Sequence, residues 1–118
     1  MRMLLIEPSD DLSYTIGLFL EDLGHEFDLV SDATPCGGSL AKGRYGCILI
    51  NVDQNSDQWR DHGLRLADTA SRNHTPVVMI ADHSLDAATA KSKGWTALQK
   101  PFTLEKLESA VADAVASV

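Results

Sequence analysis

Four short apolar runs of this chain are each followed by polar residues whose types could do chemistry. The runs span residues 3–6, 47–50, 77–80 and 95–98. Glu7 follows the first run directly, and Asn51 and Asp53 follow the second; Lys100 comes shortly after the fourth. A carboxylate can act as a nucleophile or as a ligand of a hard cation, and a lysine can hold an anion. These residues can act together only if the fold brings the ends of the runs to one place.

The stretches between the apolar runs carry helix signals. Ser9 and Thr103 are suited to cap helices with apolar stripes, and Gly24 is suited to end the first of them. The stretch 34–43 has a weak helix signal, because a proline and three glycines interrupt it. The predicted helices span 10–23, 34–43, 59–71, 84–93 and 104–115, and the predicted strands span 3–6, 26–30, 45–52, 77–80 and 95–98.

The alternation of these elements predicts the fold class. Strands that are apolar throughout and alternate with amphipathic helices are typical of a parallel sheet with helices on both faces. We therefore expect an α/β fold with a five-stranded, doubly wound, flavodoxin-like sheet in the order 2-1-3-4-5 and about five helices. The 118 residues suffice for one compact domain, which we expect to span 1–118. In such sheets ligand sites lie beyond the carboxyl ends of the strands, so chemistry is expected just after residues 6, 50, 80 and 98.

The composition argues against several classes of protein. Seventeen acidic residues against ten basic ones give a formal charge of −7, which repels nucleic-acid backbones and anionic lipids. We therefore expect no direct binding to nucleic acid or to a membrane. Cys36 and Cys47 cannot build a disulfide framework, which favours a reduced, cytoplasmic setting. The longest apolar run, 47–50, is far too short to span a membrane.

Other candidate sites have weaker patterns. Asp53, Asp57 and Asp61, expected on one loop, lack the alternate-residue ligands, central glycine and final glutamate of a calcium-binding EF-hand loop. Trp59 on the same loop could be an anchor or a partner-binding aromatic. The four histidines have no metal-ligand spacing, and the glycine pair at 37–38 lacks a nucleotide-binding fingerprint. We therefore expect no metal site among these residues.

Several local patterns occur in one characteristic order. Lys-Pro-Phe at 100–102 follows a short strand, Thr-Pro-Val-Val-Met-Ile occupies 75–80, and His-Gly-Leu occupies 62–64. These segments resemble, in turn, the Lys-Pro-Phe signature, the fourth strand and the Asp-Gly-Leu opening of the third helix in receiver domains of two-component response regulators. The resemblance covers the whole chain, from the first strand to the last helix.

The resemblance implies a phosphoryl-transfer chemistry. In the family, a kinase histidine passes a phosphoryl group to an aspartate at the end of the third strand. Acids after the first strand hold Mg²⁺, which neutralises the incoming phosphate. A lysine after the fifth strand pairs with the phosphate, a threonine or serine after the fourth strand hydrogen-bonds it, and an aromatic side chain on the fifth strand swings inward.

At the phosphoacceptor position this chain departs from the family. The position falls on Asn51, whose neutral carboxamide cannot form an acyl phosphate. Asp53 is the nearest alternative acid, two residues further on. The loop before Gly63 is longer than usual in the family, which leaves open a receiver that uses a displaced acid such as Asp53.

Most other positions of the implied phosphorylation pocket also lack the functional side chains of the family. Glu7 matches the first metal-binding acid, but Pro8 at the second position offers no side-chain oxygen. Ala81 stands at the hydroxyl position and Ala97 at the aromatic switch position. Lys100 alone is as the family has it, and we expect it to pair with Glu7 rather than to hold a phosphate. Mg²⁺ binding is therefore expected to be weak or absent, with no other cofactor and no catalytic residue.

These departures predict a degenerate, pseudo-receiver type of domain that acts in signal transduction without enzymatic activity. We expect a phosphorylation-independent module that binds a protein partner, an output domain or a second copy of itself. In the family, the last two helices and the strand between them carry such contacts. The residues expected on that face are Leu85, Lys91, Trp95, Gln99 and Lys106.

Two further expectations concern single residues, and one alternative function remains. The bond before Pro101 is a candidate for a cis peptide, as in the family. Trp95 begins a strand and is expected to pack at a helix edge. The remaining alternative is an unrelated flavodoxin-like ligand-binding domain, which would need a deep pocket with a nucleophile–base pair that the sequence does not offer.

Overall fold

The described part of the chain forms five strands and four helices. The computed structural model describes residues 1–7, 9–30, 45–52, 57–81 and 84–116, with backbone only at 10, 52, 57–60 and 84–87. The elements are β1 (Arg2–Ile6), α1 (Asp10–Asp22), β2 (Glu26–Val30), β3 (Cys47–Val52), α3 (Asp57–Arg72), β4 (Val77–Ala81), α4 (Ser84–Ser92), β5 (Thr96–Gln99) and α5 (Leu104–Ala116). The helix predicted over 34–43 lies outside the described residues.

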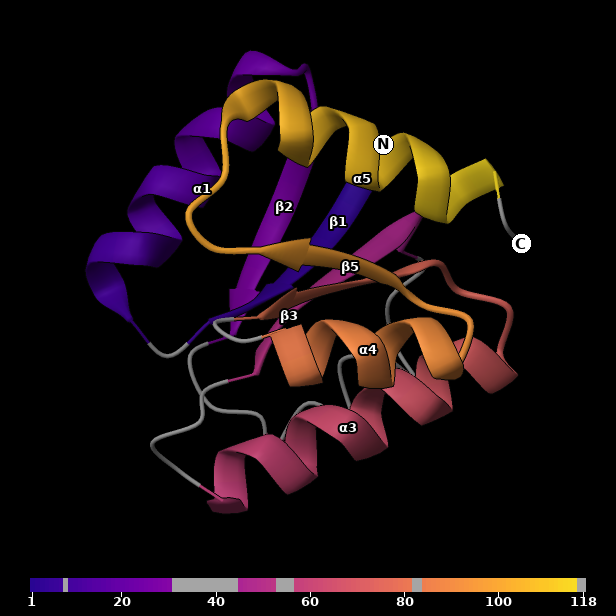
Figure 1. The fold of residues 1–118 in the computed structure, drawn as a ribbon. Helices are drawn as coiled ribbons and strands as arrows, with labels where there is room; N and C mark the ends of the chain where they lie inside the picture. The colour runs from indigo at the N-terminus through magenta and orange to yellow at the C-terminus, as the bar shows by residue number, and fades with distance from the viewer. Residues whose placement is uncertain (8, 31–44, 53–56, 82–83, 117–118) are drawn as a thin grey trace.

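The strands form one parallel sheet in the order β2-β1-β3-β4-β5, as predicted. Helices α1 and α5 cover one face of this sheet, and α3 and α4 cover the other (Figure 1). The α/β class and the doubly wound, flavodoxin-like topology are therefore confirmed. Among the described residues, no helix is long and apolar enough to cross a membrane.

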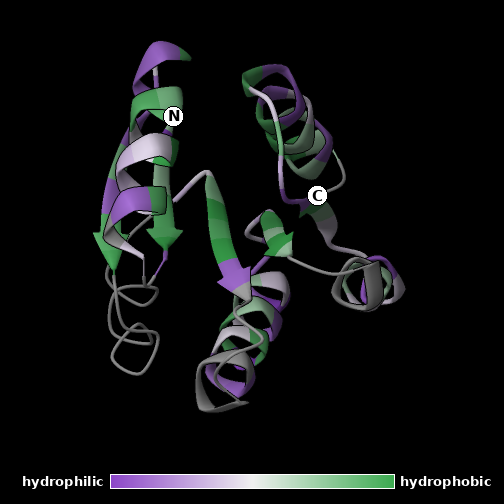
Figure 2. Ribbon diagram, turned by 60° about the vertical axis from the view of Figure 1, so that its left-hand side comes forward, coloured by the Kyte–Doolittle hydropathy of each residue, from purple (hydrophilic) through white to green (hydrophobic). Residues whose placement is uncertain are grey.

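Cover on both faces explains why the central strands β1, β3 and β4 lack polar alternation over most of their length, unlike the edge strand β2. Leu4 and Ile6 point into a core with Ala67 of α3 and Ala90 of α4. Leu5, between them in β1, points to the opposite face and into the second core, under α1 and α5. Figure 2 shows this as hydrophobic colouring along much of the sheet, interrupted by hydrophilic segments such as a strand tip. Strands of a parallel sheet that are buried on both faces carry apolar residues at nearly every position.

The helix ends confirm the capping expected from the sequence. The Ser9 side chain accepts a hydrogen bond from the Leu12 N–H at 3.3 Å at the start of α1. Thr103 does the same for the Lys106 N–H at 3.2 Å at the start of α5. Gly24 follows α1 with φ of +83°, a conformation that favours glycine.

Strands β3, β4 and β5 each extend beyond the apolar segment from which the strand was predicted. β3 continues through Asn51 to Val52, β4 includes Ala81, and β5 includes Gln99. The added residues still pair in register, with Asn51 opposite Ile80 and Val52 opposite Ala81. Backbone pairing requires only extended chains side by side, so it continues past the last large apolar side chain.

Candidate functional site

The register of the parallel sheet brings the predicted site residues to its carboxyl edge. Ile6 of β1 lies opposite Ile50 of β3, so the next residues, Glu7 and Asn51, follow side by side. Val52 lies opposite Ala81 at the end of β4. The fifth strand joins them because the Lys100 N–H donates a 2.9 Å hydrogen bond to the Ala81 carbonyl. Four predicted positions thus meet at one edge, while Pro8 and Asp53 lie outside the described residues.

A buried hydrogen bond joins Glu7 to Asn51. The Asn51 Nδ2 group donates to Glu7 Oε1 at 2.9 Å, and the two residues are 1% and 3% exposed. The Glu7 backbone is fixed as well, because its N–H donates to the Val30 carbonyl of β2 at 3.1 Å. Burying a carboxylate is costly unless donors compensate it, and a hydrogen bond to a charged group is stronger than one between neutral groups. The carboxamide therefore supplies one hydrogen-bond donor to this buried acid.

The side chains at this edge fit phosphoryl transfer poorly. The Asn51 amide is not a nucleophile, and the buried Ala81 offers a methyl group where the receiver resemblance implies a hydroxyl. Glu7 is the one carboxylate among the described residues brought together here, and an amide N–H points at its Oε1. A hard cation needs several oxygen ligands, and a donor aimed at the carboxylate opposes a cation at the same place. The described residues thus do not fit the Mg²⁺ ion implied by the resemblance.

The segment after β5 carries the lysine and the proline that were singled out. Lys100 is half-buried, and the peptide bond between Lys100 and Pro101 is cis, as the resemblance predicted. Ala97, at the predicted switch position, is half-buried and packs against the core under α3 and α4. The ion pair between Lys100 and Glu7 stays a prediction.

The face predicted for partner binding is smaller than the sequence suggested. Lys91 of α4, Gln99 of β5 and Lys106 of α5 are exposed. The Leu85 side chain lies outside the described part of the structure. Trp95 is only 6% exposed and belongs to the core, with Lys93 Nζ 5.5 Å from the centre of its ring. Its assignment to an exposed face was therefore wrong, whereas its expected packing against a helix is confirmed, because it lies in the core with Ala90 of α4.

Part of the stretch predicted as an acidic loop after β3 is helical. Asp57 and Asp61 belong to α3, which begins at Asp57, so they are not loop residues. The backbone of Trp59 lies in the same helix. Among the residues that the structure describes, no group of three or more His, Cys, Asp or Glu side chains is arranged to hold a metal ion. The idea of three aspartates on one loop is therefore corrected.

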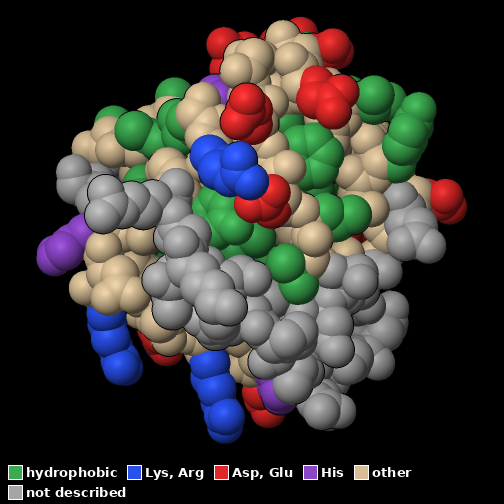
Figure 3. Space-filling model, turned by 180° about the vertical axis from the view of Figure 1, so that it is seen from behind, with side chains coloured by type: hydrophobic (Ala, Val, Ile, Leu, Met, Phe, Trp, Pro, Cys, Tyr) green, Lys and Arg blue, Asp and Glu red, His purple; other side chains and the backbone are tan. Residues whose placement is uncertain are grey.

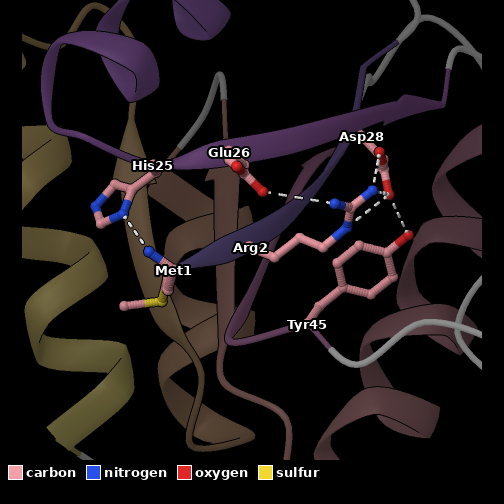
Figure 4. A network of polar contacts seen from close by, with 6 residues as sticks. All are labelled: Met1, Arg2, His25, Glu26, Asp28 and Tyr45. Carbon is pink, nitrogen blue, oxygen red and sulfur yellow. Dashed lines mark hydrogen bonds and ion pairs between the residues drawn. The ribbon is translucent and has the colours of Figure 1, made fainter.

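A second polar cluster, not predicted from the sequence, lies at the amino end of β1 (Figure 4). Arg2 donates to both carboxylate oxygens of Asp28 at 2.8 and 2.9 Å, and lies 3.6 Å from Glu26. The Tyr45 hydroxyl donates to the same Asp28 at 2.8 Å. Arg2 of β1 lies opposite Glu26 in the register. A basic residue on the first strand and acidic residues at alternate positions of the second were therefore the sequence signal that could have revealed the cluster.

The electrostatics of this cluster follow from its contacts. Hydrogen bonds from Tyr45 and then from Arg2 lower the pKa of Asp28, because they favour its charged form. Burial, followed by the bond to Asp28, raises the pKa of Tyr45. His25 nearby accepts a 3.1 Å hydrogen bond at Nδ1 from the amino terminus of Met1, and burial lowers its pKa. The cluster therefore ties β1, β2 and the start of β3 by charge.

Comparisons with known proteins agree on the fold. No protein-family model matches the chain, and no curated protein sequence matches it either. The chemotaxis protein CheY4 of Vibrio cholerae is similar with a TM-score of 0.78 at 20% identity, over 96% of this chain and 97% of that one. A response regulator receiver domain protein from Clostridium thermocellum gives a TM-score of 0.79 at 22% identity, over 98% and 94%.

A longer protein contains the same fold as one part. NtrX from Brucella abortus is similar with a TM-score of 0.80 at 24% identity, and the match covers 98% of this chain but 27% of that one. At identities this low, the likeness establishes the receiver-type fold and not the activity.

Proposed function

We propose that the chain is a receiver-type signalling domain of the degenerate kind, which binds a protein partner without accepting a phosphoryl group. The fold, shared with response regulator receivers over nearly the whole length, supports the receiver assignment. The hydrogen bond from Asn51 to Glu7 is the observation that carries the rest of the proposal.

The hydrogen bond from Asn51 to Glu7 lies where the receiver resemblance implies a phosphorylated carboxylate. An acyl phosphate forms on a carboxylate, and a carboxamide at the same place has no oxygen that can take the phosphoryl group. Two acids at this distance would repel each other and would call for a cation between them. The amide of Asn51 instead donates a hydrogen bond to Glu7, so we propose that this contact takes the place of a metal ion at the carboxyl edge of the sheet.

The neighbouring positions support the same conclusion. Ala81 is fully buried and cannot hydrogen-bond a phosphate, and Ala97 has no ring that could move on activation. A receiver that has lost its acceptor, hydroxyl and aromatic groups keeps the scaffold but not the phosphorylation switch. We propose that this domain has no enzymatic activity of its own.

The output surface is proposed to be the one formed by α4, β5 and α5. Its exposed residues are Lys91 of α4, Gln99 of β5 and Lys106 of α5. Strand β5 is an edge strand of the sheet. A protein partner, an attached output domain or a second copy could bind there; NtrX shows the fold as part of a longer chain. The formal charge of −7 argues against nucleic acid and anionic membranes as ligands, and we propose a cytoplasmic protein.

One observation favours a second candidate function. β3 extends beyond Asn51 to Val52, so Asp53 follows the end of the strand immediately. A receiver that uses Asp53 as its acceptor is therefore the alternative to test.

Phosphoryl uptake distinguishes the two. The native protein, Asn51→Asp and Asp53→Asn are incubated with acetyl phosphate and Mg²⁺, and intact mass is measured under conditions that preserve acyl phosphates. We expect no added phosphoryl group on the native protein. Stoichiometric uptake by the native chain would overturn the proposal, and its loss in Asp53→Asn would establish the alternative.

A further inference from the structure

An apolar groove lies between α1 and β2, away from the carboxyl edge of the sheet. Its volume is about 380 Å³, and its apolar lining comes from Tyr14 and Leu18 of α1 and from Phe27 and Leu29 of β2. Tyr14 is 70% exposed, Leu29 47% and Leu18 44%. These are three of the five large hydrophobic side chains that are exposed in the described part of the chain. Exposed apolar side chains that cluster are typical of binding surfaces.

The floor of the groove depends on a close approach of the helix to the strand. Gly17 of α1 lies directly over the Phe27 ring, where an added Cβ would be 2.6 Å from the ring carbon Cζ. The absence of a side chain at this position lets α1 rest on the ring, with Tyr14 and Leu18 beside it. The floor of the groove is thus set by packing of the α1 backbone on the Phe27 ring.

Acidic residues surround the groove. Asp11, Tyr14, Leu18 and Asp22 follow one another at spacings of three and four, so they form one stripe along α1 with an apolar centre and acidic ends. Glu21, one turn beyond Leu18, lines the groove itself. Neither α1 nor β2 contains Lys or Arg, and the acids near the groove are Asp11, Glu21 and Asp22 of α1, since Glu26 and Asp28 of β2 point to the other face of the sheet.

Arg2, on the neighbouring strand β1, does not neutralise the acids of α1. Arg2 lies opposite Glu26 in the β1–β2 register and one position before Met3. Met3 and Phe27 pack in the core under α1 and α5, so Arg2 and Glu26 point to the other face of the sheet. The view in Figure 3 shows hydrophobic side chains at the surface, with acidic side chains near them and a basic side chain among the acidic ones.

We propose that the α1–β2 groove binds a basic amphipathic helix of a partner protein, with apolar side chains in the groove and Lys or Arg residues against the acidic ends of the α1 stripe. Such helices dock through apolar anchors one turn apart, which matches the spacing of Tyr14 and Leu18. This surface is separate from the α4–β5–α5 face, and its use does not depend on whether the chain accepts a phosphoryl group.

Other occupants fit the groove less well. A second copy docked by the same surface would place acidic rim against acidic rim, because a two-fold interface pairs a patch with itself. An anionic lipid surface would be repelled by the same carboxylates. A small molecule is normally enclosed over most of its surface, and walls as exposed as Tyr14 do not enclose one.

The direct test uses a synthetic helical peptide with leucines on one face and lysines on the other. Its binding to the ¹⁵N-labelled full chain is followed by amide chemical shifts, with a matched peptide in which glutamates replace the lysines. We expect saturable shifts confined to α1 and β2 with the lysine peptide, weakened by added salt, and none with the glutamate peptide. No binding of the lysine peptide, equal binding of both, or shifts that map elsewhere would overturn the proposal.

Variants of the groove complete the test. Leu18→Gln and Leu29→Gln each remove a partly exposed apolar wall, and each is expected to raise the Kd of the lysine peptide roughly tenfold or more. Val115→Gln is the matched control, since Val115 is 39% exposed on α5 and lies outside the groove. Glu21→Gln with Asp22→Asn should raise Kd less and reduce its salt dependence. Thermal unfolding checks that both leucine variants are folded. An unchanged Kd of the lysine peptide in both folded variants would contradict the proposal. A dimer formed through the groove, detected by sedimentation, would also contradict it.

Discussion

Two polar contacts tie strand β1 to its neighbours, one at each end of the strand. At the carboxyl end, the Asn51 amide of β3 donates a single hydrogen bond to Glu7, and both residues are buried. At the amino end, Arg2 makes a bidentate ion pair with Asp28 of β2, and the side chains are 51% and 40% exposed. The second contact has more bonds and full charges, yet water reaches all of its groups.

The comparison shows that burial, and not the number of bonds, decides what each contact contributes. Solvent solvates the exposed ions in the unfolded and folded states alike and screens their attraction, so such pairs contribute little to stability. A buried carboxylate has lost its water, and removing its donor leaves the full desolvation penalty. The carboxyl end should therefore be sensitive to small chemical changes that the amino end tolerates.

The largest expected effect comes from Asn51→Asp. The change replaces the donor with a second carboxylate against Glu7, and it should lower the free energy of unfolding at pH 7 by about 2–3 kcal/mol in the absence of divalent cations. Repulsion raises the folded-state pKa of the pair above its unfolded value, so the folded variant binds more protons and loses stability as the pH rises through that pKa. Urea unfolding at pH 5 and pH 8 measures this.

The control is Asn51→Gln, which keeps the amide chemistry and adds only one methylene. If Asn51→Asp were as stable as the native protein at pH 8 without metal ions, the buried bond would not be the contact that holds this edge.

An intermediate effect is expected from coupling between Glu7 and Lys100. A double-mutant cycle of Glu7→Gln and Lys100→Met should give a coupling energy of about 1 kcal/mol, because a half-buried lysine interacts with a buried acid in a region of reduced dielectric. Denaturation of the four proteins at one pH gives the value. Additive effects of the two changes would refute the predicted ion pair.

The smallest effect at neutral pH is expected at the amino end. Asp28→Asn removes the negative charge that Arg2 and Tyr45 contact and leaves one acceptor oxygen, so the unfolding midpoint should change little at pH 7 and less in high salt. The pKa of Asp28 is lowered in the fold, so its contribution is present above the unfolded value and is lost as the pH falls through the folded one. Acid titration of stability should therefore become shallower in Asp28→Asn.

Glu26→Gln serves as its control, since Glu26 lies further from Arg2 and is 82% exposed. A loss of stability in Asp28→Asn at pH 7 as large as that of Asn51→Asp would contradict the ranking of the two ends.

Sequence patterns predicted the fold well because each signal was local. Apolar runs such as 77–80 mark strands covered on both faces, and Ser9 and Thr103 mark helix starts through bonds to residues three positions on. The meeting of Glu7 with Asn51 was also predictable, since parallel strands end at a common edge. The donor in that contact depends on side-chain orientation, which only the structure shows.

Other features depend on packing between distant segments. A tryptophan such as Trp95 fits equally well at a surface or at the end of a core, and its neighbours decide the outcome. The contact of Arg2 with Asp28 requires the exact register of β1 and β2. The α1–β2 groove requires Gly17 to rest on Phe27, a contact between segments that no periodicity reports.

The central claim is that the Asn51–Glu7 bond closes the carboxyl edge to metal ion and phosphate. The most direct test follows the Asn51 side-chain amide and the backbone amides of Ala81 and Lys100 by ¹⁵N NMR, while Mg²⁺ and then beryllofluoride are added. We predict that none of these signals moves in a saturable way, while Asn51→Asp responds to Mg²⁺. A saturable shift of the three signals in the native protein, completed by beryllofluoride, would contradict the account.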